Sequence, residues 1–299
     1  MADTAQAATA SRQLQRQGML MFLGALLAFA VYDAFAKHML AHYPATLMNL
    51  TRYAAVCSLA LIGLMRHGDW SAWQVWRQPH RKLLLLRSLM LAIVATSFMT
   101  ALASMPLAEA TAIYFTAPLI MVALSPWLLG EAVGRVQWVA VLLGFAGMLL
   151  IVRPGGSLPL AGSLLMALSA ICYALFQVLT RRLSGLVPAP VQYAYMAVVC
   201  LVVTNLPALV MPVEHWPGWD EIAVLLAGGL VSGAAQLLLL AAFQRVSASV
   251  LAPMNYLQLL LAVLISTFWF QRPPDGLALA GMGVIGAAGL YLAWPRRLK

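Results

Sequence analysis

Apolar residues run through nearly the whole chain in long blocks, which short turns containing proline, glycine or polar residues separate. Most blocks are about 20 residues long, the length that an α-helix needs to cross the hydrocarbon layer of a membrane. Ten blocks can be separated, and we number them spans 1 to 10: 18–41, 44–65, 83–104, 106–129, 135–152, 160–181, 188–211, 221–243, 247–270 and 275–294. The pattern predicts an all-α integral membrane protein with ten transmembrane helices.

Span 4 departs from a simple lipid-facing helix. It carries Glu109 near one end and Pro118 in the middle, and Gly130 and Glu131 follow it directly. A carboxylate and a mid-span proline are costly against lipid and are tolerated where they face protein or a wet cavity. We therefore expect span 4 to line the interior of the helix bundle.

The composition supports a membrane protein. The chain is 63% hydrophobic and only 9% charged, whereas soluble domains carry about 25% charged residues. The net charge of +9 would suggest a nucleic-acid partner in a soluble protein. Here the cations gather in short loops and in the tails, so we expect the lipid bilayer, and no nucleic acid, as the partner.

The distribution of cations predicts the orientation of the chain. If the N-terminus is cytoplasmic, the opposite face holds only Lys37, Arg153 and Arg272. The cytoplasmic loops and tails then contain Arg12, Arg16, Arg66, Arg77, Arg81, Lys82, Arg87, Arg135, Arg181, Arg182, Arg245, Arg296, Arg297 and Lys299. This positive-inside bias predicts a multi-pass membrane protein with both termini in the cytoplasm.

The two halves of the chain resemble each other. Residues 101–118 can be aligned with 241–258, and the stretch from Lys37 to Pro44 aligns with the stretch from Arg181 to Pro188. Each half then has five spans, and an odd number inverts the second half relative to the first. This predicts a cytoplasmic tail (1–17), two inverted five-helix repeats (18–153 and 158–294) and a basic tail (295–299). Such architecture is typical of transporters with a site near the membrane midplane.

The sequence resembles the drug/metabolite transporter superfamily, in its ten-span bacterial branch built from two EamA-type repeats. The resemblance rests on Lys37, Arg52, the stretch Ala110-Thr-Ala-Ile-Tyr-Phe-Thr-Ala-Pro118, the Gly130-Glu131 pair, and Gly144 with Gly147. In the second half Gln258, Gln271 and Met196 replace Pro118, Glu131 and Arg52, so the polar chemistry belongs to the first half. The resemblance implies a secondary transporter that exports small metabolites, and amino acids above all.

Depth arithmetic predicts which polar residues lie together. With about 1.5 Å of rise per helical residue, Asp33, Arg52 and Tyr114 each lie about 12 Å from the outer end of their spans. Lys37 follows Asp33 by one helical turn, and Glu109 lies in the first turn of span 4, where the helix dipole favours an acid. Asp33, Lys37 and Arg52 either form a buried ion network or line the substrate path.

The second interpretation leads to a concrete hypothesis about the substrate. A zwitterionic amino acid would place its carboxylate at Arg52 and its ammonium at Asp33, replacing a pairing between the two side chains. From the second half, the candidates for the pathway are Tyr173, Gln177, Gln236, Asn255, Tyr256 and Gln258. If these residues do not line the pathway, the tyrosines are interhelical or interfacial anchors, and the asparagine and glutamines form hydrogen bonds between helices. A neutral, aromatic surface would suit apolar or aromatic side chains.

Two further groups of residues concern movement and packing. Pro118 and Pro253 either kink spans 4 and 9 permanently or let them flex as gates during alternating access. Glycines at three-residue spacing in spans 5 and 10 indicate close helix packing. They predict scaffold helices and a monomer, or a weak dimer through these spans.

Other functional classes are less well supported by the sequence. Motifs for an enzyme, a metal site, a cofactor or nucleotide binding are not found. A channel does not explain the inverted repeat, whereas a multidrug or organic-cation exporter would use Asp33 and Glu109 as attractive groups. Transport would be facilitated or coupled to protons, and Asp33 and Glu109 are the acids deep enough for proton coupling.

Overall fold

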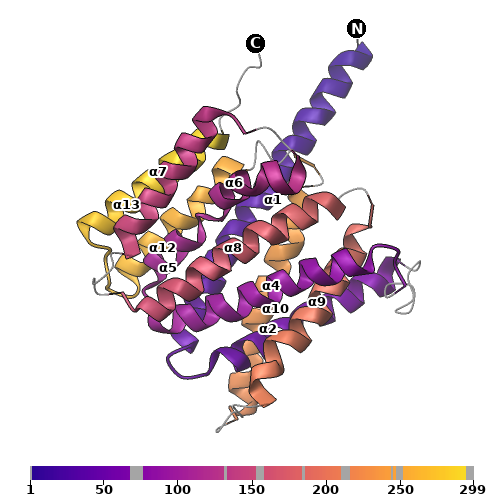
Figure 1. Ribbon diagram of the computed structural model, residues 1–299. Coiled ribbons are helices and arrows are strands. Elements are labelled where there is room, and N and C mark those ends of the chain that lie inside the picture. The colour runs from indigo at the N-terminus through magenta and orange to yellow at the C-terminus, as the bar shows by residue number, and fades with distance from the viewer. Residues whose placement is uncertain are drawn as a thin grey trace.

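The computed structural model describes residues 2–67, 77–130, 133–152, 158–183, 186–209, 216–243, 245–246 and 252–293. The regular elements of these ranges are all helices (Figure 1). They are α1 (Ala2–Met39), α2 (Ala45–His67), α4 (Arg81–Ser104), α5 (Leu107–Tyr114), α6 (Ala117–Leu129), α7 (Arg135–Val152), α8 (Leu160–Leu183), α9 (Ala189–Asn205), η1 (Leu206–Leu209), α10 (Trp219–Phe243), η2 (Ala252–Asn255), α12 (Tyr256–Phe268) and α13 (Gly276–Ala293). Glu131 and the basic tail lie outside the described residues.

The apolar helices follow the predicted order of spans. Among the described residues, 6 helical stretches are long and apolar enough to cross a membrane: Gln13–Met39, Ala45–Gly63, Arg81–Ser104, Leu107–Leu124, Leu160–Thr180 and Trp219–Ala242. Shorter apolar helices cover 137–152, 190–205, 256–268 and 276–291 and correspond to spans 5, 7, 9 and 10. The all-α membrane architecture is therefore confirmed.

The first helix is longer than its apolar part. The sequence suggested a separate tail before span 1, but α1 is one continuous helix from Ala2 to Met39, and its apolar stretch begins at Gln13. Figure 1 shows its N-terminal turns projecting beyond the bundle. The residues before Gln13 include five alanines, the residue with the highest helix propensity, so they can form a helix without being buried.

The packing of the helices has the symmetry of an inverted repeat. The main helix pairs are α1 with α10, α4 with α8, α2 with α10, α4 with α9, α2 with α9, α5 with α12, and α7 with α13. The counterparts in the two halves are α1 and α8, α2 and α9, α4 and α10, α5 and α12, and α7 and α13. Exchanging each helix for its counterpart converts the α1–α10 pair into the α8–α4 pair and the α2–α10 pair into the α9–α4 pair. The pairs α2–α9, α5–α12 and α7–α13 are unchanged by the exchange. This is the pattern that a pseudo-two-fold axis between the halves produces.

Span 4 is broken into two helices. α5 ends at Tyr114 and α6 begins at Ala117, and the amide of Thr116 donates to the carbonyl of Ile113 at 3.1 Å. Pro118 has no amide hydrogen and so cannot donate to the carbonyl of Tyr114, as an uninterrupted helix requires. The break thus lies just before the proline. Pro253 lies in η2, the short 3₁₀ helix that leads into α12.

The glycines of spans 5 and 10 bring α7 and α13 close together. A Cβ on Gly147 would lie 2.8 Å from the carbonyl oxygen of Gly281, so only glycine fits at this crossing. Gly283 and Gly286, by contrast, face open space on α13. The close packing seen at Gly147 is that of scaffold helices, and a dimer through the open face of α13 stays a prediction.

The largest buried cluster fills one end of the bundle. Its members include Tyr32, Leu47, Leu102, Leu107 and Leu225, which lie near the ends of their helices that are predicted to be outside. Toward the other end, the buried side chains divide into several smaller clusters. The bundle is therefore packed more continuously at its predicted outer end.

Candidate functional site

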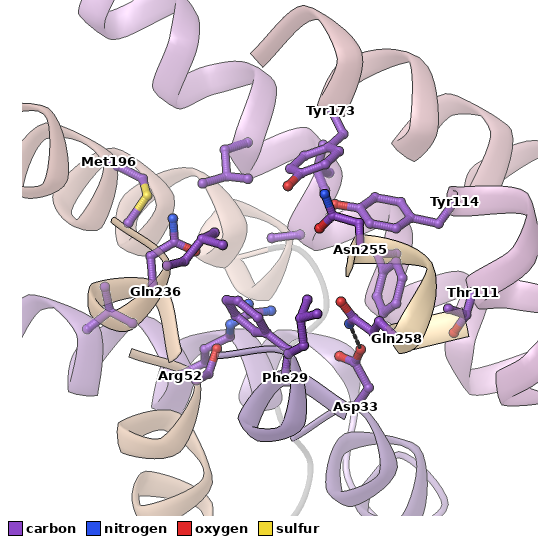
Figure 2. A pocket seen from close by; sticks show the side chains of 18 of the residues that line it. Phe29, Asp33, Arg52, Thr111, Tyr114, Tyr173, Met196, Gln236, Asn255 and Gln258 are labelled. Carbon is purple, nitrogen blue, oxygen red and sulfur yellow. Dashed lines mark hydrogen bonds between the residues drawn. The ribbon is translucent and has the colours of Figure 1, made fainter. Parts of the chain in front are cut away.

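A cavity lies in the middle of the bundle, between helices of both repeats, and we call it the central cavity (Figure 2). It is partly open to solvent, and its lining of apolar and aromatic side chains with a few polar groups is the kind found in small-molecule sites. Seven of the predicted pathway residues line it: Asp33, Arg52, Tyr114, Tyr173, Gln236, Asn255 and Gln258. The structure thus brings together side chains from α1, α2, α5, α8, α10, η2 and α12.

Asp33 and Gln258 join the two repeats across this cavity. The side-chain amide of Gln258 on α12 donates to a carboxylate oxygen of Asp33 on α1 at 3.1 Å (Figure 2). A carboxylate accepts several hydrogen bonds, and Gln258 supplies one of them. Asp33 therefore has capacity left for a donor from a ligand.

Arg52 lies against aromatic rings. Its guanidinium carbon is 4.7 Å from the ring centroid of Tyr32 and 5.5 Å from that of Tyr53, which are cation–π distances. The Nε atom of Arg52 is buried and has no hydrogen-bond partner. A buried donor without a partner costs free energy, so this nitrogen is a ready site for an acceptor.

The pairing expected between Asp33 and Arg52 is not the one that the structure shows. Asp33 takes Gln258 as its partner, and Arg52 stacks on Tyr32 and Tyr53. The ion network is not seen among the described residues either, because the ammonium of Lys37 donates to the carbonyl oxygen of Leu102 at 2.7 Å. The acid and the base of the cavity thus each have neutral partners.

Aromatic side chains form one wall of the cavity. The ring of Tyr114 lies 5.2 Å from that of Phe98, edge to face, and 5.0 Å from that of Tyr173. Tyr173 in turn stacks on Phe176 at 5.9 Å. Such pairs are fixed by their ring geometry and offer a flat, polarisable surface. This wall can pack against a planar or apolar group of a ligand.

The cavity continues toward the predicted cytoplasmic end. Leu26, Met196 and Leu239 line it on that side, whereas the continuous cluster around Leu102 and Leu107 fills the opposite end. The lining of the cavity therefore extends farther toward the predicted cytoplasmic end than toward the predicted outer end.

The remaining predicted residues lie away from the central cavity. Lys37 lies at the outer end of α1 and lines a different hollow. Glu109 is buried in the first turn of α5, where its Oε2 atom has no partner. Gln177 and Pro118 do not line the cavity either, and the side chain of Pro253 lies outside the described part of the structure. Within the described part of the chain, no group of His, Cys, Asp and Glu side chains is arranged to hold a metal ion.

Tyr256 points toward the scaffold and not into the cavity. A Cβ added to Gly289 of α13 would overlap the hydroxyl group of Tyr256, so the missing side chain of Gly289 makes room for this ring. The hydroxyl oxygen is buried without a hydrogen-bond partner, and the ring lies 6.1 Å from that of Phe115. Tyr256 lies two residues before Gln258, and residues at that spacing face different sides of a helix. For this reason Gln258 faces the central cavity and Tyr256 does not.

Several residues around the cavity were not singled out by the sequence. Phe29, Tyr53, Phe98, Phe115 and Ser232 also line it. In an apolar span such residues resemble ordinary core packing. One signal was available for Phe29, which precedes Asp33 by four residues and so shares its helix face.

The location of Arg87 also differs from the one predicted from the sequence. The charge count places it among the cytoplasmic loop cations, but it lies in the second turn of α4 and is buried. Its Nε donates to the hydroxyl of Thr180 at 2.7 Å, and its guanidinium lies 4.4 Å from the ring centroid of Phe176. Arg87 thus ties α4 to α8, outside the central cavity.

Comparison with known proteins identifies the family of this fold and site. The chain is 29% identical over 273 residues to a riboflavin transporter of Vibrio cholerae, covering 90% of each chain. It is 28% identical over 284 residues to the pseudopaline exporter CntI of Pseudomonas aeruginosa, covering 94% of this chain and 97% of the relative. An S-adenosylmethionine uptake transporter of Rickettsia bellii is 29% identical over 215 residues, covering 71% of this chain and 72% of the relative.

A solved structure and a family model agree with these relatives. One crystal structure matches with a TM-score of 0.68 and 22% identity, covering 93% of this chain and 99% of the other, which supports the fold alone. The model of the EamA-like transporter family matches residues 16–153 and again 160–294. Two matches that together cover most of the chain show that this protein belongs to the EamA-like transporter family.

Proposed function

We propose that the protein is a secondary transporter that exports small zwitterionic metabolites, above all amino acids with apolar or aromatic side chains. Membership of the family supports transport of a small molecule across a membrane. The substrate class is our inference from the central cavity. Alternating access between the two repeats would carry the solute past Asp33 and Arg52.

One observation carries this proposal: the cavity holds an arginine that no carboxylate occupies. Arg52 contacts aromatic rings and keeps an unpartnered Nε, so a substrate carboxylate would gain charge-assisted hydrogen bonds there. Asp33 is held by the neutral amide of Gln258, which an ammonium group of the substrate would replace. A zwitterion matches both groups at once.

The aromatic wall and the relatives support a substrate with a flat or apolar part. S-adenosylmethionine and riboflavin, named for two relatives, both contain a planar heteroaromatic ring, and S-adenosylmethionine also contains an α-amino-acid group. Tyr114 and Tyr173 offer rings against which such a group can stack. The names of the relatives include both uptake and export. We favour export because the pseudopaline exporter CntI matches 94% of this chain, whereas the S-adenosylmethionine uptake transporter matches 71%.

An organic-cation exporter is the second candidate. Asp33 beside the rings of Tyr114 and Phe98 would attract a lipophilic cation. Arg52 in the same cavity opposes a bare cation by like-charge repulsion. The charge of Arg52 therefore favours the zwitterion.

Location and energy coupling complete the proposal. We place the protein in the bacterial inner membrane with both termini in the cytoplasm, on the strength of its cation distribution. Two acids inside the spans, Asp33 and the buried Glu109, are candidates for proton coupling. Transport that ignores an imposed pH gradient would instead favour a facilitator.

Ligands that differ by one charged group test the substrate class. The ligands all contain a phenyl ring. Phenylalanine carries both the ammonium and the carboxylate, phenylethylamine carries only the ammonium, and 3-phenylpropionate carries only the carboxylate. Titration calorimetry on the purified protein should give the tightest binding for phenylalanine. If phenylethylamine binds at least as tightly, the carboxylate has no role and the organic-cation exporter is the better account.

A further inference from the structure

A second hollow lies at the end of the bundle that is predicted to be outside. Its lining comes from the last turn of α1, the junction between α4 and α5, and the end of α12. We call it the outer hollow and define it by Lys37, Met105, Pro106, Ser266 and Arg272. It is separate from the central cavity, because no residue lines both.

Two cations from different repeats face this hollow. Lys37 belongs to α1 of the first repeat, and Arg272 follows α12 of the second. Both side chains line the same hollow, so their like charges repel each other. Within the described part of the chain, neither forms an ion pair with a carboxylate. An anion between them would remove this repulsion.

Lys37 is held in place by backbone carbonyl groups. Its Nζ donates to the carbonyl oxygens of Leu102 at 2.7 Å and Ala103 at 3.4 Å. Both carbonyls lie in the last turn of α4, where they lack partners within the helix and where the helix dipole favours a cation. An ammonium has three donors, so one remains for a ligand in the outer hollow.

Arg272 is held by an unusual turn at the end of α12. Gln271 has a φ of 52°, the left-handed region that residues other than glycine rarely adopt. The amide of Arg272 donates to the carbonyl of Ser266 at 2.9 Å, and the hydroxyl of Ser266 donates back to the carbonyl of Arg272 at 2.8 Å. Backbone strain that neighbouring bonds maintain is common at functional sites. Here it holds Arg272 at the rim of the hollow.

The outer hollow lies on the same two helices that close the central cavity. Lys37 follows Asp33 by about one helical turn on α1, and α12 connects Gln258 with the turn before Arg272. A solute that leaves Asp33 and Gln258 toward the outside would meet these cations next. The carboxylate that Arg52 binds in the proposed function would then find a second cationic partner.

We propose that Lys37 and Arg272 form an oxyanion-binding site at the outer end of the bundle. Its ligand is the carboxylate of a solute on the outer side or the phosphate of an anionic lipid headgroup, since both present the same charged oxygens. The role as an exit station for the substrate rests on the proposed function, whereas the binding of an oxyanion does not.

Protection of Lys37 from acetylation measures this binding directly. The chain has only three lysines, Lys37, Lys82 and Lys299, so mass spectrometry can follow each one after treatment with an N-hydroxysuccinimide ester. In phosphatidylcholine vesicles, benzoate at about ten times its Kd should slow acetylation of Lys37 about tenfold. Lys82, at the other end of the bundle, and the neutral analogue benzamide are the controls.

Variants and lipids separate the possible outcomes. Arg272→Gln should abolish the protection, Arg272→Lys should retain it in part, and Arg135→Gln, which removes an exposed arginine of α7, should leave it intact. Vesicles containing phosphatidylglycerol without benzoate test the lipid: protection there assigns the site to a headgroup, and protection by benzoate alone assigns it to a solute.

Two results would overturn the proposal. If neither benzoate nor phosphatidylglycerol slows the acetylation of Lys37, the site does not bind oxyanions. If Arg52→Gln removes the protection by benzoate, the anion acts from the central cavity and the outer site is not independent. Neither result bears on phenylalanine binding in the central cavity, so the proposed function is judged separately.

Discussion

Replacement of Arg52 by glutamine should remove substrate binding while the protein stays folded. Where a buried arginine is paired with an acid, its removal leaves the acid unpaired, at a cost of about 3–5 kcal/mol. Here Asp33 is hydrogen-bonded to Gln258 instead, so Arg52→Gln leaves no acid without a partner. The loss in stability is then limited to the two ring contacts with Tyr32 and Tyr53, about 1–2 kcal/mol in total.

The effect on binding should be larger. A carboxylate that loses its charged partner in a desolvated site costs about 3–5 kcal/mol. At about 1.4 kcal/mol for each factor of ten, this raises the Kd of phenylalanine about 100- to 1,000-fold or more. Arg52→Lys keeps the charge but loses the planar pair of donors. Its Kd for phenylalanine should therefore lie between that of the parent protein and that of Arg52→Gln.

Titration calorimetry and thermal unfolding in detergent check this prediction together. Arg87→Gln is the matched control, because Arg87 is also buried and also stacks on an aromatic ring, but lies outside the central cavity. It should lower the unfolding temperature and leave the Kd unchanged. The reasoning is refuted if folded Arg52→Gln binds phenylalanine as tightly as the parent protein.

Three further substitutions test other parts of the site and the fold. Asp33→Asn removes the charge that would face the ammonium, so the Kd of phenylalanine should rise about tenfold or more while that of 3-phenylpropionate stays nearly constant in the same calorimetric assay. Tyr114→Leu removes stacking worth about 0.5–1.5 kcal/mol, so competition experiments should show a larger loss for aromatic than for aliphatic amino acids. Gly289→Ala places a methyl group on the Tyr256 ring and should destabilise the protein by about 1–3 kcal/mol. Thermal unfolding should show partial recovery when Tyr256→Leu is added, and purely additive losses would mean that the two residues do not clash.

Much of the architecture follows from the sequence because the membrane imposes a simple rule. A helix in lipid must bond its own backbone over about 20 apolar residues, so apolar blocks and turns locate the spans. The rise per residue then places Asp33, Arg52 and Tyr114 at one depth, and the structure does bring these three to one cavity.

Rotation about the helix axis is harder to read from one sequence. Tyr256 and Gln258 are two residues apart and cannot both face the cavity, but only the packing of Tyr256 into the space above Gly289 shows which one turns away. Lys37 shares a face with Asp33, yet its long side chain reaches the carbonyl oxygens of α4. Arg87 looks like a loop cation because the sequence does not reveal the hydroxyl of Thr180 and the ring of Phe176 that accommodate it inside the bundle.

Counterflow in proteoliposomes tests the central claim most directly. Vesicles that contain the purified protein and are loaded with unlabelled phenylalanine should accumulate labelled phenylalanine, and a lipophilic cation should not compete. Empty vesicles and the Arg52→Gln protein should show no accumulation. Running the assay with and without a pH gradient also reports proton coupling. The account is contradicted if labelled cation accumulates and phenylalanine does not, or if Arg52→Gln exchanges phenylalanine at the rate of the parent protein.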